Sequence, residues 1–117
     1  MEKYLRTLEK IIPKKVYGFF QPLYHLALAH IGTRIYRNPS KKIYVIAVTG
    51  TKGKSSTTEF ISAVLEAAGK KTAVLSTIRF KLGDTSRENK YKMTMPGRFF
   101  TQKFLREAVD ASCEYAI

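Results

Sequence analysis

Residues 43–56, with the sequence IYVIAVTGTKGKSS, carry the strongest structural signal in the chain. Residues 43–48 are apolar and mostly β-branched, which is typical of a strand buried on both faces in a parallel sheet. The residues that follow contain two glycines, two lysines and several hydroxyl side chains, and they lead into a segment with helical periodicity. A buried strand, a glycine-rich loop and a helix, in this order, predict a phosphate-binding loop.

Each residue type in this loop suits a polyphosphate ligand. Gly50 and Gly53 let the backbone bend so that N–H groups face the phosphates, and the helix that begins near Ser55 adds the positive end of its dipole. We expect Lys54 to contact the β- and γ-phosphates and Ser55 to offer its hydroxyl to Mg²⁺. The alternative is a polar turn that only caps a helix, and Lys54 together with the preceding strand disfavours it.

Apolar spacing predicts further helices and strands after the loop. A helix carries apolar residues at helical spacing and ends at Gly69; these residues are Phe60, Ile61, Val64, Leu65 and Ala68. Residues 71–78 form a second strand, residues 79–97 a hairpin-like excursion, and residues 115–117 the opening of a third strand. A third helix precedes that strand and points inward with Phe100, Phe104, Leu105, Ala108 and Val109. These elements predict an α/β fold of the P-loop type, with three layers and a parallel sheet that is truncated at the end of the chain.

Residues 1–41 form a separate basic and apolar segment, so we expect one domain boundary between residues 41 and 42. Residues 1–12 have the pattern of an amphipathic helix that Pro13 ends. Residues 16–31 contain no charged side chain, and Pro22 is placed to open a helix that runs to about Tyr36. This apolar run is too short and too polar to span a membrane. It is therefore either buried against the rest of the protein or lies in a membrane interface with basic flanks.

Composition limits the function classes. With 117 residues the chain cannot hold a complete multidomain enzyme, and its 44% hydrophobic residues exclude a wholly disordered protein. The single cysteine, Cys113, excludes an internal disulfide and indicates a reducing cytoplasm. The net charge of +12 points to phosphates in nucleotides, nucleic acid or lipid headgroups. Because no nucleic-acid recognition motif is present, a nucleic-acid-binding module is the least favoured of these classes.

The loop resembles that of the Mur ligase superfamily, the ATP-dependent amide ligases that build the peptidoglycan stem peptide, to which folylpolyglutamate synthase is related. Residues 49–56 match the family pattern T-G-T-N-G-K-[ST]-[ST] at every position except Lys52. Residues 70–78 are similar to the family's second strand, and Thr94-Met95-Pro96 resembles the T-T-P element of the diaminopimelate- or lysine-adding ligases. Residues 113–117 resemble the strand that runs into a metal-binding Glu, which would follow Ile117.

The resemblance implies a reaction and a set of site residues. The γ-phosphoryl group of ATP passes to a substrate carboxylate, and an amine attacks the acyl phosphate to give an amide, ADP and phosphate. Lys54 is the expected catalytic residue, Ser55 the metal ligand, and Thr94 the contact to the substrate carboxylate, with a simple loop hydroxyl as the alternative for Thr94. Ser56 either caps the helix or contacts the α-phosphate. The nucleotide-binding set is Gly50, Thr51, Lys52, Gly53, Lys54, Ser55 and Ser56.

The resemblance also implies cofactors, partners and a location. ATP and Mg²⁺ are the expected cofactors, and a muropeptide-like carboxylate with an amine is the expected substrate pair in peptidoglycan precursor synthesis. The rest of the catalytic machinery is expected in a C-terminal portion beyond this chain. We expect a cytoplasmic protein, with residues 1–37 as a contact to the inner face of the membrane. A folylpolyglutamate-synthase-like ligase, a membrane-peripheral module and a basic nucleic-acid-binding module remain the alternatives.

The sequence predicts that the 117-residue chain alone has no ligase turnover. Amide ligation needs a metal-binding acid, an amine site and closure over the acyl phosphate, and the resemblance places these groups outside the chain. The test incubates the pure chain with Mg-ATP and a panel of muropeptide and amino-acid substrates while phosphate release and amide product are followed. Turnover that disappears in a Lys54→Ala variant would contradict the prediction.

Overall fold

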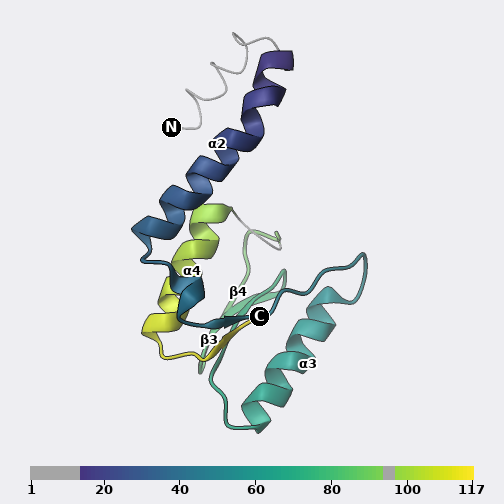
Figure 1. Cartoon of the computed structure of the whole chain (residues 1–117). Helices are drawn as coiled ribbons and strands as arrows, with labels where there is room; N and C mark the ends of the chain where they lie inside the picture. Colours follow the sequence, from purple (N-terminus) through teal and green to yellow (C-terminus); the bar gives the residue numbers. More distant parts are fainter. Residues whose placement is uncertain (1–13, 94–96) are drawn as a thin grey trace. The chain divides into compact units, whose positions relative to one another are not determined.

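The computed structural model describes residues 14–93 and 97–117 (Figure 1). Its elements are the helices α2 (Lys14–Ile35), α3 (Lys54–Ala67) and α4 (Arg98–Asp110), the short 3-10 helix η1 (Pro39–Lys41), and the strands β1 (Tyr44–Val45), β2 (Thr72–Leu75), β3 (Arg79–Leu82), β4 (Thr85–Glu88) and β5 (Tyr115–Ala116). The chain divides into two compact units, residues 1–31 and residues 32–117. The helix expected over residues 1–12 lies outside the described residues, and the domain boundary between residues 41 and 42 stays a prediction.

The strands form one mixed sheet in the order β1-β5-β2-β3-β4. β5 lies between β1 and β2 and runs parallel to both, with Tyr115 beside Tyr44 on one side and Thr72 on the other. The α/β fold predicted from the sequence is confirmed. The sheet is not parallel throughout, because β3 and β4 add to it as an antiparallel hairpin. Only three residues connect β2 to β3, which is too few for the crossover that a parallel pair needs.

Helices α3 and α4 cover opposite faces of this sheet and give the predicted three layers (Figure 1). Neighbouring residues of β3 show the division, because successive side chains of a strand point to opposite faces. The Phe80 ring packs toward Phe104 of α4, with 6.2 Å between the ring centroids. The Arg79 guanidinium reaches Glu59 of α3 instead. One face of the sheet is therefore apolar and the other is polar.

The apolar core lies between the sheet and α4. Its buried members are Ile43, Ala73, Phe80, Phe104, Leu105, Ala108, Cys113 and Ala116. The inward face predicted for the third helix is confirmed, since Phe104, Leu105 and Ala108 are buried while Phe100 and Val109 pack against the same cluster. Burial raises the pKa of the Cys113 thiol, whose Sγ lies 3.5 Å from the carbonyl oxygen of Thr72.

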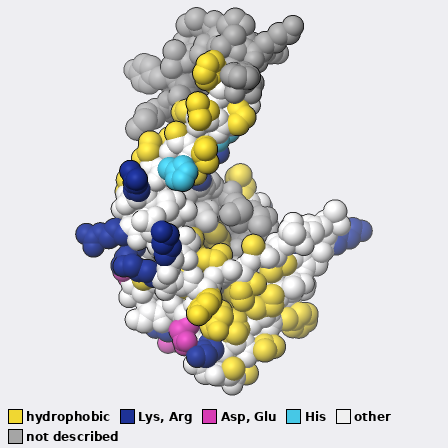
Figure 2. Space-filling view, in the orientation of Figure 1, with side chains coloured by type: hydrophobic (Ala, Val, Ile, Leu, Met, Phe, Trp, Pro, Cys, Tyr) yellow, Lys and Arg dark blue, Asp and Glu magenta, His cyan; other side chains and the backbone are white. Residues whose placement is uncertain are grey.

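Helix α3 turns a different face to the sheet from the one its sequence predicts. The helical spacing of Phe60 and Val64 is typical of a buried face, yet these residues are 71% and 69% exposed, whereas Thr58 and Ser62 are buried. Figure 2 shows hydrophobic side chains gathered over this part of the surface. The physical reason is the polar face of the sheet: Arg79 and Lys81 bind Glu59 and Glu66 of α3, which turns the Phe60 side of the helix outward.

Strand β1 also differs from its prediction. Residues 43–48 were expected to be buried on both faces, but Tyr44 and Val45 are 72% and 51% exposed, and Ile43 is the one residue of the run that is buried. Within the described part of the chain β1 is an edge strand, so it pairs with β5 alone. A strand at an edge lacks the neighbours that bury a central strand.

Helix α2 is longer at its start than the sequence predicts. Pro22 lies inside it rather than opening it, and the helix ends at Ile35. A proline inside a helix removes one backbone hydrogen bond, but leucine and alanine, both strong helix formers, follow it closely. Among the described residues, no helix has the length and apolar character needed to cross a membrane.

Candidate functional site

The predicted phosphate loop lies between β1 and α3, and its backbone has the conformation that the glycines allow. Gly53 precedes the first residue of α3 with a φ of 78°, and Gly50 has a φ of 154°. Side-chain-bearing residues rarely adopt either value, so both glycines are needed for the path of the loop. Helix α3 begins at Lys54, one residue before the predicted start. Its first N–H groups have no carbonyl partner within the helix and can bind an anion.

Lys54 folds back over the loop. Its Nζ donates a hydrogen bond to the carbonyl oxygen of Gly50 at 2.7 Å. The ammonium group therefore lies over the turn that Gly50 and Gly53 form, where phosphate oxygens would be bound. A phosphate oxygen of a bound polyphosphate would replace the Gly50 carbonyl as the acceptor of this ammonium group, because a charged acceptor forms the stronger hydrogen bond.

A pocket of about 150 Å³ brings Lys54 and Ser55 together with the carboxyl ends of the parallel strands. It is lined by Val45, Ile46, Ala47, Val48, Lys54, Ser55, Thr58, Leu75, Ser76, Thr77, Thr101, Phe104, Leu105, Ala116 and Ile117. This is the edge at which open α/β sheets bind ligands. The other predicted nucleotide-binding residues are exposed and do not line the pocket, namely Gly50, Thr51, Lys52, Gly53 and Ser56. Thr94 lies outside the described residues.

Four hydroxyl side chains that line this pocket were not among the predicted site residues, namely Thr58 of α3, Ser76, Thr77 and Thr101. Ser76 and Thr77 follow β2 directly, and Thr101 lies in the first turns of α4. Ser76 and Thr77 could have been found by their position, because residues just after parallel strands gather at the ligand-binding edge. Thr101 carries no such signal, since its place in the pocket depends on how α4 packs on the sheet.

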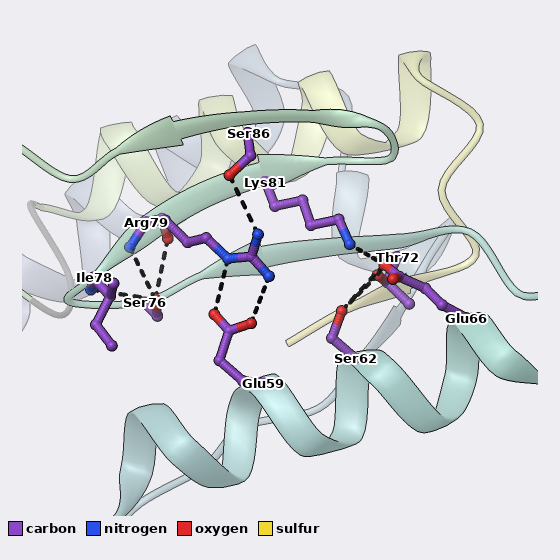
Figure 3. A network of polar contacts seen from close by, with 9 residues as sticks. All are labelled: Glu59, Ser62, Glu66, Thr72, Ser76, Ile78, Arg79, Lys81 and Ser86. Carbon is purple, nitrogen blue, oxygen red and sulfur yellow. Dashed lines mark hydrogen bonds and ion pairs between the residues drawn. The ribbon is translucent and has the colours of Figure 1, made fainter.

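The polar face of the sheet anchors the helix that carries Lys54. Glu59 of α3 accepts hydrogen bonds from both Nε and a terminal nitrogen of Arg79, the first at 3.0 Å (Figure 3). Arg79 also donates to the hydroxyl of Ser86 in β4 at 3.4 Å. This contact joins α3 to both strands of the hairpin. The hydrogen bonds from Arg79 lower the pKa of Glu59 below its ordinary value.

A second carboxylate, that of Glu66 about two turns farther along α3, completes the anchor (Figure 3). Glu66 pairs with Lys81 of β3, and its Oε1 accepts the hydroxyl of Thr72 at 2.6 Å and that of Ser62 at 3.2 Å. The hydrogen bond from Lys81, followed by that from Thr72, lowers the pKa of Glu66. The C-terminal half of α3 is thus fixed to β3 by the ion pair with Lys81 and to β2 by the hydrogen bond from the Thr72 hydroxyl.

Among the hydroxyl groups of the pocket, that of Ser55 lies at the start of α3 beside Lys54 and is an oxygen ligand suited to Mg²⁺. Mg²⁺ prefers oxygen ligands and is commonly shared between few protein groups and substrate phosphates, so Ser55 beside Lys54 fits that ion. In residues 14–93 and 97–117, no cluster of three or more His, Cys, Asp or Glu side chains could hold a metal. The roles of the loop residues toward nucleotide and metal remain predictions.

Comparison with known proteins matches residues 48–117 to the family model "Mur ligase middle domain". The chain is 40% identical over 91 residues to a UDP-N-acetylmuramoyl-L-alanyl-D-glutamate--2,6-diaminopimelate ligase of Syntrophomonas wolfei, an alignment that covers 78% of this chain and 18% of the relative. It is 38% identical over 91 residues to a UDP-N-acetylmuramyl-tripeptide synthetase of Treponema pallidum, covering 78% and 17%. A protein of the same description from Roseiflexus is 34% identical over 96 residues, covering 82% and 19%. The chain spans less than a fifth of the length of these relatives.

We predict that the anchor of α3 makes stability depend on acid pH. A carboxyl group with a lowered pKa in the folded state stabilises the protein above its ordinary value of 4.5, and this stabilisation is lost as the pH falls below it. At pH 7, Glu59→Gln should lower the free energy of unfolding by about 1 kcal/mol, the upper end for partly exposed ion pairs. Urea unfolding at pH 7 and pH 3 measures this. The exposed Glu88→Gln is the matched control, and an equal loss for both variants at pH 7 would refute the anchor.

Proposed function

Because the chain belongs to the Mur ligase family, we propose that it forms the ATP-binding portion of an ATP-dependent amide ligase in peptidoglycan precursor synthesis. The observation that carries the proposal is the position of Lys54, whose Nζ lies 2.7 Å from the Gly50 carbonyl in a pocket shared with Ser55. The relatives reported above are named as ligases of muramyl peptides, which favours this class over a folylpolyglutamate-synthase-like ligase.

In the proposed reaction, the loop positions ATP and neutralises charge. Lys54 binds the β- and γ-phosphates, and the N–H groups at the start of α3 bind phosphate oxygens. Ser55 holds Mg²⁺, which would neutralise phosphate charge when bound. Thr51 and Lys52 lie in the loop and Ser56 lies in the first turn of α3, and all three are exposed and would contact the nucleotide from its exposed side. Thr94 is proposed to bind the carboxylate that accepts the phosphoryl group before an amine displaces phosphate.

We predict that Lys54→Ala abolishes binding of Mg-ATP, because the charge on the β- and γ-phosphates is lost with the side chain. Isothermal titration calorimetry of the 117-residue chain measures it, and the dissociation constant should rise by about 100-fold or more, the effect of losing a charged hydrogen bond and its ion pairing. Lys90→Ala is the control, because Lys90 is an exposed lysine that does not line the pocket. Equal affinity of the wild type and the Lys54→Ala variant would reject the proposed site.

The remainder of the enzyme is a proposed partner of this chain. The relatives are more than five times longer than the matched region, so most of their length has no counterpart here. The exposed Phe60 and Val64 of α3 and the exposed Tyr44 and Val45 of β1 support the proposal, since such apolar surface is normally covered. A metal-binding acid and the amine site would come from that remainder.

We further propose that the protein is cytoplasmic and that residues 1–37 contact the inner face of the membrane. Helix α2 contains no acidic residue, and basic residues lie at both of its ends. Several of its large apolar side chains are more than half exposed, namely Phe20, Leu23, Leu26 and Ile35. Apolar side chains with cationic flanks favour an anionic lipid surface. Burial of α2 against another part of the enzyme is the alternative.

We predict that the chain co-sediments with vesicles of phosphatidylglycerol and phosphatidylcholine at low salt. Neutral phosphatidylcholine vesicles should bind less, since they lack the attraction to the basic flanks. A variant without residues 1–37 should stay in the supernatant. If the full chain also stays there with anionic vesicles, helix α2 is not a membrane contact and its apolar side chains must be covered by protein.

A further inference from the structure

The turn after β2 carries Thr77 into the pocket and is closed by Ser76. The Ser76 N–H donates to the carbonyl oxygen of Arg79 at 3.1 Å. Its hydroxyl oxygen in turn accepts the N–H groups of Ile78 at 3.3 Å and Arg79 at 3.2 Å (Figure 3). Thr77 lies within this closed turn and lines the pocket together with Lys54 and Ser55.

Asn89 holds this turn from outside at the carbonyl groups of the two residues on either side of Thr77, Ser76 and Ile78. Its Nδ2 donates to the carbonyl oxygen of Ser76 at 2.8 Å, and its backbone N–H donates to the carbonyl oxygen of Ile78 at 3.0 Å. The Asn89 side chain is 3% exposed, so water does not compete for these hydrogen bonds. The position of Thr77 therefore depends on a residue twelve positions later in the chain.

The same amide group organises the segment that follows it. Asn89 Oδ1 accepts the N–H of Tyr91 at 3.0 Å, and Nδ2 donates a second hydrogen bond, to the carbonyl oxygen of Met93, at 2.8 Å. Lys92, between them, has a φ of 51°, a left-handed conformation that a closed turn must hold in place. The side chain thus uses both N–H donors and its acceptor, a combination that an aspartate of the same shape cannot supply.

We propose that Asn89 is a positioning residue of the nucleotide pocket, which acts by fixing Thr77 so that the Thr77 hydroxyl donates to phosphate oxygens of the bound nucleotide. The proposal rests on the proposed function, because it takes the anion in this pocket to be the polyphosphate of ATP. The proposal adds Thr77 to the residues that contact the nucleotide. It also couples the pocket to residues 91–93, because the side-chain amide of Asn89 is hydrogen-bonded to Tyr91 and Met93 as well.

Binding of Mg-ATP to single and double variants tests the positioning role. Asn89→Asp and the isosteric Thr77→Val should each raise the dissociation constant at pH 8 by about tenfold, the range for one lost hydrogen bond. The double variant should be no weaker than Asn89→Asp, since Asn89 acts through Thr77. Asn38→Asp is the matched control, because Asn38 is an asparagine outside the pocket, and its affinity should stay within about twofold of the wild type.

A pH series separates positioning from general damage to the fold. In Asn89→Asp a carboxylate faces the carbonyl oxygens of Ser76 and Met93, and protonation returns one donor to that position. The affinity of this variant should therefore approach that of the wild type at the same pH as the pH falls from 8 to 5.5. Asn89→Ala has no group to protonate and should show no such recovery.

Amide hydrogen exchange measured by NMR tests the clamp without any nucleotide. Asn89→Ala should speed exchange at the Tyr91 N–H, which loses its acceptor, and unchanged exchange there would refute the clamp. Faster exchange with an unchanged dissociation constant for Asn89→Asp would refute the positioning role alone. If the wild type binds no Mg-ATP, the proposed function fails and the role of Asn89 toward phosphate fails with it.

Discussion

A pleated strand sends alternate side chains to opposite faces, and in β3 this alternation separates charged from apolar groups. Phe80 enters the core under α4, while Arg79 and Lys81 meet the carboxylates of α3. The helix that carries the phosphate loop is therefore held by directional polar contacts rather than by a broad apolar interface. The pairing of Glu59 with Arg79 and of Glu66 with Lys81 sets how far α3 is shifted along its axis and how it is rotated about it.

This anchoring bears on the loop itself. The first turn of α3 has to stay in place while Lys54 exchanges its hydrogen bond to Gly50 for one to a ligand. The carboxylate of Glu59 fixes the helix a little more than one turn after Lys54. The hairpin that supplies Arg79 also leads to Asn89, so one short antiparallel excursion supports both the helix and the opposite wall of the pocket. The phosphate loop, helix α3 and the turn that carries Thr77 are therefore all held by the hairpin of β3 and β4 and the residue that follows it.

Much of this arrangement could be predicted from the sequence. The bends at Gly50 and Gly53, the stop at Gly69 and the apolar face of α4 depend on local patterns, and the structure confirms each of these features. The role of Lys54 toward phosphate stays a prediction. The exposure of Phe60 could not be predicted, because apolar spacing marks a face that needs cover but not which neighbour provides it. The position of β5 between β1 and β2 could not be predicted either, because strand order in a sheet depends on contacts between distant parts of the chain. Asn89 was missed because the three partners of its side chain are backbone groups, which leave no pattern in the sequence.

In the part of the chain that the structure describes, the outer edge of β1 is unpaired, and this edge also affects how the chain behaves at high concentration. An unpaired strand edge is a template for self-association and aggregation, and exposed Tyr44 and Val45 would add to that tendency. The strand is only two residues long, and Lys41 and Lys42 precede it with only Ile43 in between. Two chains that pair through this edge would bring four ammonium groups close together. Charge repulsion should then keep the chain dispersed at low salt and weaken as salt screens it.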